Sequence, residues 1–380
     1  MLNNKLAMWR VDRFLLPLSW LCVLVVAVSC SASETGKSMP VDELPQVEAH
    51  RATDFSAALD CSAYPEMSGY NLLFTDRDGK QMSFVEMLSA NDIRAVRLRV
   101  WVNPPGGYSS LSSVAAFAGE LRARGIRIWL SMHYSDSWAD PGKQDPPAAW
   151  QKLDFDALRD SMTAYTGRVA KLIAPDVIQI GNEINDGFLH PHGSLSLAPE
   201  QCLALLRSGI EAVRKNAPKA AVMLHYAGIN GAVNFFERMS ELPYDLIGLS
   251  YYPIWHGKSL DALEAVVKEL TNTHQRELWI AETAYPFTLD WNDWTHNIVG
   301  LESQLILPGY PATPEGQKRF LERLQAMLDK YPLAKGLCYW GAELVAWKGP
   351  YATDASPWEN QALFDFDLKA LPALQLFGGK

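Results

Sequence analysis

The sequence predicts an α/β fold, a (β/α)8 TIM barrel that forms a single domain. Three observations favour this fold. From residue 50 onward, short apolar runs alternate with amphipathic segments, which is the pattern of βαβ units and a parallel sheet. Eight such units can be placed before the C-terminus, as a closed barrel requires. An open doubly wound sheet, the competing fold, usually carries a glycine-rich phosphate turn after its first strand, and Thr53-Asp54-Phe55-Ser56 is not such a turn.

The individual elements follow from hydrophobic periodicity and β-branched content. We expect strands at residues 51–55, 95–101, 127–133, 177–183, 221–226, 246–252, 278–283 and 336–340. We expect helices at residues 83–90, 113–124, 155–173, 199–216, 233–241, 260–273 and 314–330, with a short segment at 371–377 as the candidate for an eighth. No internal repeat and no second domain is evident, so residues 50–380 are expected to form one domain.

Polar and aromatic side chains stand at the carboxyl ends of these expected strands. In a barrel the strand ends converge on one mouth, where active sites lie. Arg97 and Arg99 alternate onto one face of the second strand. The other strand-end residues are His133, Glu183, His225, Tyr252, Glu282 and Trp340. One such residue could be structural, whereas the whole set predicts a catalytic mouth.

The heptapeptide Gln179-Ile180-Gly181-Asn182-Glu183-Ile184-Asn185 is the centre of this pattern. The β-branched pair Val177-Ile178 precedes it, and the turn signal Asp186-Gly187 follows it. Glu183 is therefore expected at the end of a short buried strand. A carboxylate is costly to bury there unless it is paired or used. The alternative is a loop glutamate, or one held in a salt bridge.

Glu183 and Glu282 are expected on the fourth and seventh strands, which can face each other across a barrel mouth. A retaining glycosidase uses two carboxyl groups about 5–5.5 Å apart, one as acid/base and one as nucleophile. Their environments must give them different pKa values. Asn182 could hydrogen-bond the sugar 2-hydroxyl, a contact that strengthens in the transition state.

Composition narrows the class of ligand. The chain is 48% hydrophobic and 20% charged, with a formal net charge of −9. No basic run is present, which argues against nucleic acid or an anionic membrane surface as partner. The 13 tryptophans suit sugar rings, although most could be core packing.

Residues 1–30 are expected to be a targeting segment. Lys5, Arg10 and Arg13 form a basic start, and an apolar stretch too short for a typical membrane span follows. Small residues before Cys30 resemble a bacterial lipoprotein signal, in which Cys30 would carry the lipid; Ala27 replaces the usual leucine. A plain secretory signal or an uncleaved anchor are the alternatives. Residues 31–49 are expected to be a polar tether.

The remaining cysteines, Cys61, Cys202 and Cys338, give no disulfide framework and no metal motif. We expect free buried thiols.

Several longer motifs resemble glycoside hydrolase family 53, the endo-β-1,4-galactanases, over roughly residues 50–375. The most specific is the third-strand loop, His133-Tyr134-Ser135-Asp136-Ser137-Trp138-Ala139-Asp140-Pro141-Gly142-Lys143-Gln144. The other motifs are Val96 to Pro104, Gly181 to Asn185, Ser250-Tyr251-Tyr252-Pro253, Glu282-Thr283-Ala284-Tyr285-Pro286 and Asn360 to Asp365.

This resemblance, and that of the Asn-Glu and Glu pair to the wider clan of retaining barrel glycosidases, implies roles for individual residues. Glu183 would be the acid/base and Glu282 the nucleophile. Tyr252 would hydrogen-bond the nucleophile and keep it ionised; alternatively, it is a packing aromatic. The substrate-binding candidates are Arg99, His133, Trp138, Asp140, Asn182, Asn185, His225, Tyr252, Trp340 and Trp347. The His133 loop could instead be only a shaped turn, and Trp347 could be loop packing.

The sequence departs from the family pattern at the eighth strand. Members often have Tyr-Trp-Glu-Pro where Tyr339-Trp340-Gly341-Ala342-Glu343 stands here. Some bacterial members also bind calcium between the seventh and eighth loops. The corresponding residues are Asp290, Asp293, His296, Asn297, Ser356 and Glu359, whose irregular spacing suits solvated loop carboxylates slightly better than a cation site.

The resemblance implies endo-hydrolysis of β-1,4-galactan, such as the (arabino)galactan side chains of pectin, with retention. No cofactor is required, and any calcium would be structural. We expect a monomer, secreted or in the cell envelope and attached to a membrane only through the N-terminal lipid. Another retaining barrel hydrolase acting on mannan, xylan or an arabinose-bearing glycan is the nearest alternative. A non-catalytic glycan-binding lipoprotein is the other, and the two glutamates argue against it.

Overall fold

The computed structural model describes residues 53–379. The expected targeting segment, the tether, Cys30 and the first two residues of the expected first strand lie outside the described residues. Within them, no helix combines the length and apolarity that crossing a membrane would take.

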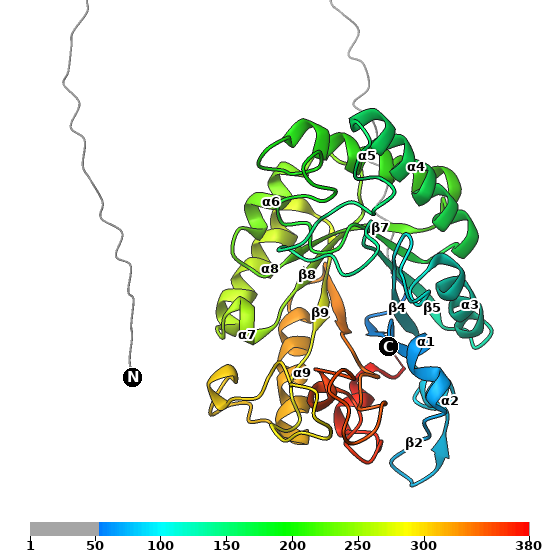
Figure 1. Cartoon of the computed structure of the whole chain (residues 1–380). Coiled ribbons are helices and arrows are strands. Elements are labelled where there is room, and N and C mark those ends of the chain that lie inside the picture. The colour runs from blue at the N-terminus through cyan, green and yellow to red at the C-terminus, as the bar shows by residue number, and fades with distance from the viewer. Residues whose placement is uncertain (1–52, 380) are drawn as a thin grey trace, which may run out of the picture. The chain divides into compact units, whose positions relative to one another are not determined.

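Eight parallel strands close into a barrel in the order β1-β10-β9-β8-β7-β6-β5-β4 (Figure 1). The expected (β/α)8 TIM barrel is confirmed. The strands are β1 (Ala57–Asp60), β4 (Ala95–Val100), β5 (Arg127–Met132), β6 (Val177–Ile180), β7 (Ala221–Ala227), β8 (Leu246–Ser250), β9 (Glu277–Thr283) and β10 (Ala334–Tyr339).

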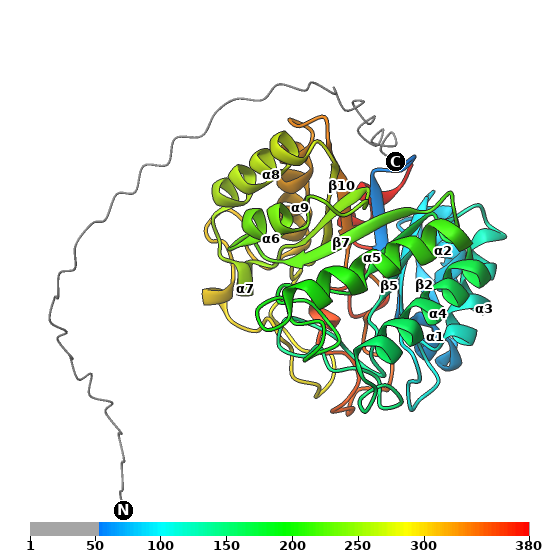
Figure 2. The ribbon, with the colours of Figure 1, turned by 90° about the horizontal axis from the view of Figure 1, so that it is seen from above.

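The helices that return the chain between strands surround the barrel (Figure 2). Most begin at a side-chain cap, as at Ser110, Asp154, Ser259 and Thr313, whose oxygens accept a backbone N–H of the first turn. They are α2 (Phe84–Ala90), α3 (Leu111–Arg122), α4 (Phe155–Ile173), α5 (Pro199–Asn216), α6 (Ala232–Arg238), α8 (Leu260–His274) and α9 (Pro314–Leu328).

The structure also contains short elements that the sequence did not predict. They are α1 (Tyr64–Met67), the hairpin of β2 (Phe74–Thr75) and β3 (Gln81–Met82), and α7 (Pro253–His256). Three short 3₁₀ helices span Ser68–Tyr70, Glu302–Gln304 and Glu359–Gln361. The candidate eighth helix at 371–377 is a 3₁₀ helix, Pro372–Phe377, rather than an α-helix.

The expected first strand was wrong. The strand is Ala57–Asp60, and residues 53–55 precede it as irregular chain. The alanine pair has weak strand propensity, so local pattern favoured the wrong segment. The correction matters because Asp60 thereby becomes the last residue of β1, at the mouth.

The barrel interior changes character along its axis. Below the mouth it is apolar, with Trp129 and Trp279 in edge-to-face contact at 5.5 Å. Above this layer come inward-facing polar side chains, beginning with Arg97, whose guanidinium lies 6.0 Å from the Trp129 ring centroid. The apolar floor therefore supports a polar mouth.

Gly336 provides a test of barrel closure. A Cβ at this position in β10 would lie 1.7 Å from the backbone carbonyl oxygen of Ser56, next to β1. We expect Gly336→Ala to lower the free energy of unfolding by about 3 kcal/mol or more, because backbone rather than a side chain must move. Urea denaturation measures this change.

Gly119→Ala is the matched control. Gly119 lies in α3, and a Cβ added there would have no heavy atom within 4 Å beyond its own helix backbone and chain neighbours. The substitution should therefore stabilise the chain by roughly 0.5–1 kcal/mol. Equal effects of the two substitutions would contradict this view of the closure.

Candidate active site

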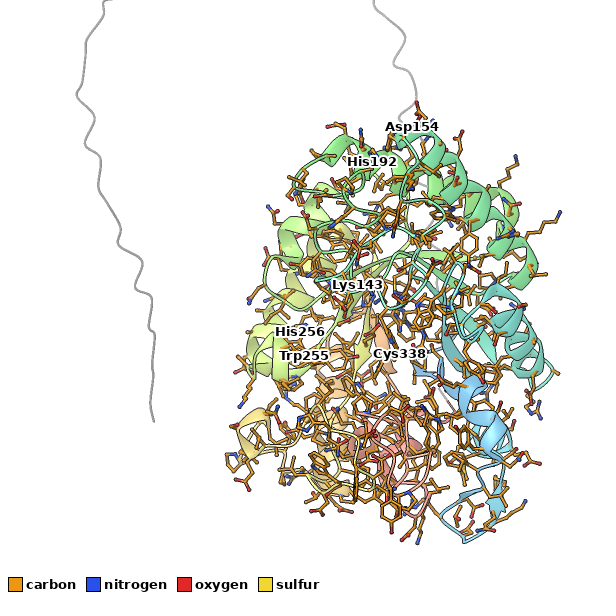
Figure 3. All side chains as sticks on the ribbon, viewed as in Figure 1. Lys143, Asp154, His192, Trp255, His256 and Cys338 are labelled. Atoms are coloured by element: carbon orange, nitrogen blue, oxygen red, sulfur yellow. The ribbon has the colours of Figure 1, made fainter. Side chains whose placement is uncertain are left out.

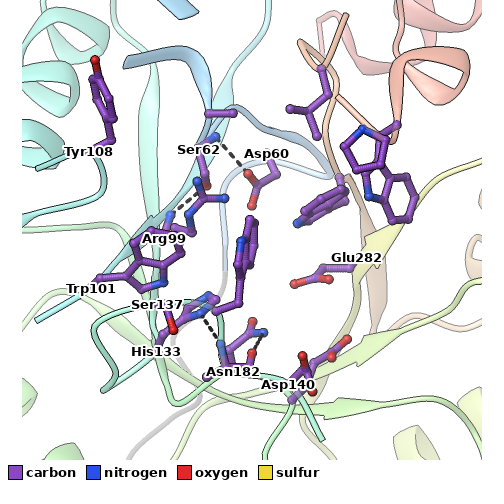
Figure 4. Close-up of a pocket in the computed structure, with 18 of the residues that line it drawn as sticks. Asp60, Ser62, Arg99, Trp101, Tyr108, His133, Ser137, Asp140, Asn182 and Glu282 are labelled. Carbon is purple, nitrogen blue, oxygen red and sulfur yellow. Dashed lines mark hydrogen bonds between the residues drawn. The ribbon is translucent and has the colours of Figure 1, made fainter. Parts of the chain in front are cut away.

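A cavity of about 970 Å³ opens at the carboxyl ends of the strands. It is lined by the carboxyl ends of strands β1, β4, β7 and β9 and by loops that follow β1, β4, β5, β6, β8 and β10. In Figure 4, Glu282 projects into it from one side, while Arg99, Trp101 and His133 lie on the opposite side. The volume is at the upper end of the range of about 300–1,000 Å³ that is typical of ligand pockets.

An uncommon backbone conformation orients the side chain of Glu183. Glu183 follows β6 with φ 49°, and Gly181 just before it has φ 84°. A Cβ at Gly181 would also meet Ile184 Cγ2 at 2.4 Å, so only glycine fits. A left-handed conformation at a non-glycine residue is costly and concentrates at functional sites. Here it turns the carboxyl group of Glu183 toward the cavity.

Glu282 lies near the end of β9, beside an irregularity in the β8–β9 pairing. Its Oε1 is 2.7 Å from an Arg97 guanidinium nitrogen, and its Oε2 accepts a 3.0 Å hydrogen bond from the Tyr252 hydroxyl. Both partners favour the ionised form of this carboxyl group.

The two carboxyl groups are close together. One oxygen of Glu183 and one of Glu282 lie within 4.8 Å of each other. Inverting glycosidases keep their carboxyl groups about 6.5–9.5 Å apart to admit a water, so this spacing is that of the retaining type. A nitrogen of His225 lies within the same distance, but both its nitrogens have hydrogen-bond partners, and we assign the carboxylates to chemistry rather than to metal binding.

Different neighbouring groups separate the proton affinities of the two carboxyl groups, although burial acts on both. Burial and the nearby Glu282 charge raise the pKa of Glu183 to about 8. Burial also raises the pKa of Glu282, against the opposing effects of Arg97 and Tyr252. Glu282 has a guanidinium partner, and among the described residues Glu183 has none. The pair therefore loses its first proton from Glu282, and the resulting charge keeps Glu183 protonated.

Arg97 joins several elements beneath the mouth. It is 1% exposed and forms a 2.6 Å ion pair with Asp60, its register partner across β1 and β4. It also donates to Gln179 Oε1 at 2.7 Å and to Asn182 Oδ1 at 2.9 Å. Two carboxylates and two amide oxygens thus satisfy a guanidinium that would otherwise be very costly to bury.

Asn182 is held from both sides. Its Oδ1 accepts from Arg97 and from the Ser131 hydroxyl, and its Nδ2 donates to the Ala139 carbonyl at 2.9 Å. One Nδ2 hydrogen is left for a ligand. The Ala139 amide in turn donates to His133 Nδ1 at 3.2 Å, which ties the third-strand loop to the barrel.

Aromatic rings form a continuous wall around the cavity. Trp138, Trp340 and Trp358 follow one another with ring centroids 5.9 and 4.6 Å apart. Trp255 continues the series at 5.9 Å from Trp358, and it lines the cavity together with its neighbour His256 of α7; both residues are labelled in Figure 3. Flat apolar faces of this kind suit pyranose rings.

Arg99 stiffens the other end of this wall. Its guanidinium lies 4.6 Å from the Trp101 ring centroid and 4.0 Å from that of Trp138, and its Nε donates to Ser109 Oγ. Such stacking on two rings fixes the orientation of Trp138, which is 43% exposed. Burial lowers the pKa of Arg99 to about 10, so it stays charged at neutral pH.

The structure brings most of the predicted site residues to this cavity. Asn185 and His225 do not line it: both amide atoms of Asn185 bind the backbone of Ala227, and His225 is fully buried. The geometry therefore does not support the prediction that Asn185 and His225 contact a substrate directly. The residues that do line it are Arg99, His133, Trp138, Asp140, Asn182, Glu183, Tyr252, Glu282, Trp340 and Trp347.

Sequence reasoning missed several polar residues. Asp60 was hidden by the misplaced first strand. Gln179, Ser131 and Ser250 are polar side chains inside otherwise apolar strands, and that was the available signal. Trp101, expected as the last residue of a strand, lies in the loop after β4, Trp358 lies in another loop, and Trp255 lies in the short helix α7, so hydrophobic periodicity did not mark them as site residues.

The candidate calcium ligands divide into two groups. Asp293, Asn297 and Glu359 are buried, and each has one side-chain oxygen without a hydrogen-bond partner. Asp290 and His296 are exposed, and the Ser356 hydroxyl already donates to the Leu344 carbonyl.

The fold and the paired carboxyl groups define a barrel glycoside hydrolase. More particularly, the chain belongs to glycosyl hydrolase family 53, whose sequence model matches residues 57–377.

Similarity to individual proteins agrees with this family. The chain is 33% identical over 345 residues to the arabinogalactan endo-β-1,4-galactanase of Cellvibrio japonicus, covering 86% of this chain and 91% of that protein. It is 29% identical over 374 residues to the endo-β-1,4-galactanase of Bacillus subtilis, covering 85% of each. The solved family 53 catalytic domain of Ignisphaera aggregans superposes with a TM-score of 0.80 at 35% identity, covering 89% of this chain and 97% of that one.

Tyr252→Phe tests the support of Glu282. Losing a hydrogen bond to a charged group costs roughly 1.5–3 kcal/mol, so kcat/KM for glycoside hydrolysis should fall about 10- to 100-fold. The hydroxyl favours ionised Glu282, so its loss raises the pKa of Glu282 and moves the acid limb of the pH–rate profile to higher pH. Tyr251→Phe, whose hydroxyl binds only the Gly257 carbonyl, should leave that limb in place. An unmoved acid limb in Tyr252→Phe would contradict the assignment.

Proposed function

We propose that the chain is an endo-acting, retaining β-1,4-galactanase that cleaves (arabino)galactan chains such as the side chains of pectin. The observation that carries this proposal is the pair Glu183 and Glu282, with oxygens within 4.8 Å of each other in the open cavity of a family 53 chain. The activity named for the Cellvibrio and Bacillus relatives supports galactan as the substrate.

In the first step, Glu282 attacks the anomeric carbon while Glu183 gives its proton to the glycosidic oxygen. The C–O bond to the leaving chain breaks, a covalent glycosyl ester forms on Glu282, and Glu183 becomes a carboxylate. The raised pKa of Glu183 suits it to hold this proton at neutral pH.

In the second step, Glu183 takes a proton from a water that attacks the same carbon from the face vacated by the leaving chain. The ester bond breaks, Glu282 is released as a carboxylate, and Glu183 is protonated again. Two inversions give net retention. The free Nδ2 hydrogen of Asn182 is placed to bind the 2-hydroxyl during both steps.

The shape and lining of the cavity support internal cleavage of a neutral chain. The aromatic wall from Trp138 to Trp255 lines the same cavity as the two carboxyl groups and offers several ring faces, which supports binding of more than one sugar unit. Arg99 of β4 and Asp140 of the loop after β5 line the same cavity and offer polar contacts to hydroxyl groups.

Product analysis on potato-type galactan tests the proposal. We expect a ladder of galacto-oligosaccharides by thin-layer chromatography, and little product from mannan or xylan. Glu282→Ala and Glu183→Ala should each lower kcat on galactan at least about 1,000-fold, because each removes a group that reacts covalently or transfers the proton. Galactose alone would indicate exo-action. Inert galactan beside a cleaved mannan, xylan or arabinan would overturn the substrate assignment.

We also propose a structural cation, of the calcium type, held by Asp293, Asn297 and Glu359. Among the described residues neither acid forms an ion pair, although Asp293 is 3% and Glu359 1% exposed. Burial and the nearby Asp293 charge raise the pKa of Glu359, which signals an uncompensated pair of acids. An all-oxygen donor set with unpartnered atoms is the kind that a hard cation takes. The two-carboxylate reaction does not pass through it.

Chelation tests this cation. A bound ion at a hundredfold excess over its Kd stabilises by about 2.7 kcal/mol, so EDTA should lower Tm by roughly 3–6 °C and added Ca²⁺ should restore it. Glu359→Gln should make Tm insensitive to EDTA. An identical Tm with EDTA and with Ca²⁺ in the unsubstituted protein would contradict the proposal.

We propose further that the enzyme is a monomer of the cell envelope or the extracellular space, anchored by a lipid on Cys30. The support is the basic, apolar and small-residue order of residues 1–30 and the polar composition of residues 31–49.

A further inference from the structure

Four fully buried polar side chains lie beneath Glu183 and Glu282. They are Arg97 on β4, Gln179 on β6, His225 on β7 and Ser250 on β8, each at most 1% exposed. Polar groups buried this deeply must find their hydrogen-bond partners among one another. A donor and an acceptor can therefore be assigned for each of their hydrogen bonds.

The direction is set at Arg97. A guanidinium can only donate, so the Gln179 oxygen, rather than its nitrogen, must face Arg97 Nε at 2.7 Å. The Gln179 amide nitrogen then faces His225 Nδ1 at 2.9 Å and can only donate to it. His225 Nδ1 is therefore an acceptor without a hydrogen.

The tautomer of His225 follows. Burial and the Arg97 charge lower the pKa of His225 well below its usual value, so the ring is neutral and its one hydrogen is on Nε2. The Glu183 backbone N–H, at 3.4 Å from Nδ1, agrees with an acceptor there. Asn182 Oδ1 also lies 3.3 Å from Nδ1, but it already accepts from Arg97 and Ser131 and needs no hydrogen from the ring. Nε2 lies 2.9 Å from Ser250 Oγ and donates to it.

Ser250 has one hydrogen left to place. Its oxygen accepts from His225, and Glu183 Oε1 lies 2.5 Å away. The serine hydroxyl therefore donates to Oε1. Among the described residues, no hydrogen bond involves the other carboxyl oxygen of Glu183, Oε2. Glu183 itself lines the cavity.

We propose that the one-way relay from Arg97 through Gln179, His225 and Ser250 reserves Oε1 of Glu183 as a permanent acceptor, so that Oε2 is the atom that delivers and recovers the catalytic proton. The proposal rests on the acid/base role of Glu183 in the proposed function. Gln179, His225 and Ser250 act through Glu183 and are positioning residues.

The relay also sets when Glu183 is protonated. From the elements packed around it, burial, Glu282 on β9 and Asp140 in the loop after β5 favour the acid, while Arg97 and the Ser250 hydroxyl favour the carboxylate. His225 on β7 is neutral, and Tyr252 after β8 donates to Glu282. Ser250 is the uncharged donor on the carboxyl group of Glu183 itself. It keeps Glu183 able to act as a base in the second step.

Ser250→Ala removes that donor and fills no new space. We expect kcat on galactan to fall about 10- to 100-fold, as for the loss of a hydrogen bond to a charged group. The alkaline limb of the pH–rate profile should move to higher pH, because the carboxylate form of Glu183 loses its donor. Ser250→Thr keeps a hydroxyl and should restore the position of the limb.

Ser131→Ala is the matched control. Ser131 is equally buried and bonds to Arg97 and Asn182, but it does not touch Glu183. This variant should leave the alkaline limb unmoved even if turnover falls. A merely structural role for Ser250 would make the two alanine variants alike.

A substrate-free readout separates this inference from the proposed function. Carbon-13 NMR titration of labelled glutamate side chains, with Glu183→Gln identifying the Glu183 signal, should show a higher pKa of Glu183 in Ser250→Ala than in the unsubstituted or Ser250→Thr protein. An unchanged pKa would overturn the relay whatever the substrate. An unchanged rate on galactan with a shifted pKa would overturn the catalytic use of Oε2, and inert galactan with a shifted pKa would overturn the substrate alone.

Discussion

The buried guanidinium of Arg97 is the constraint on which the rest of the site depends. It is paired with Asp60 at 2.6 Å and with Glu282 at 2.7 Å, under a mouth that admits almost no water to it. Removing a partner from a buried pair leaves an uncompensated charge, which costs several kcal/mol. The cation therefore fixes the ends of β1, β4 and β9 relative to one another. It also fixes which of the two catalytic carboxyl groups is ionised.

The fold makes two chemically identical side chains behave differently. Glu282 stands in strand β9 beside a cation, whereas Glu183 follows β6 in a left-handed conformation with a serine donor on its carboxyl group. Burial acts on both, so the difference comes from the partners. The apolar layer of Trp129 and Trp279 below keeps water from screening these charges. Acid/base and nucleophile are thus distinguished before any substrate binds.

Much of this could be predicted from the sequence, because a parallel barrel repeats a local pattern. The helix from Phe155 to Ile173 is where periodicity places it, and the strand that carries Gln179 begins at Val177 as expected but ends at Ile180 rather than at Glu183. Glu183 and Glu282 were visible because acids at the ends of apolar strands are rare. The first strand was misplaced, since its alanines carry little strand signal, and Asp60 was lost with it.

What the sequence could not supply is the pairing of groups across strands. Ser250 and His225 are ordinary strand residues until the register places Gly248 and His225 side by side and brings the Ser250 hydroxyl to Glu183. Hydrogen-bond direction depends on a donor-only partner, Arg97, that is 82 residues from Gln179 along the chain. Likewise, the shared role of the tryptophans in the aromatic wall is visible only in the folded chain, where they line one cavity.

The central claim, that Glu282 forms a covalent bond to the sugar while Glu183 moves the proton, is tested most directly by trapping the intermediate. A 2-deoxy-2-fluoro-β-galactobioside with a dinitrophenolate leaving group slows both steps but still allows the first. Mass spectrometry of a peptide digest should find one 2-deoxy-2-fluoro-galactobiosyl group on the peptide that contains Glu282, and none in Glu282→Ala. A label on the Glu183 peptide, or no label together with products of inverted anomeric configuration, would contradict the account.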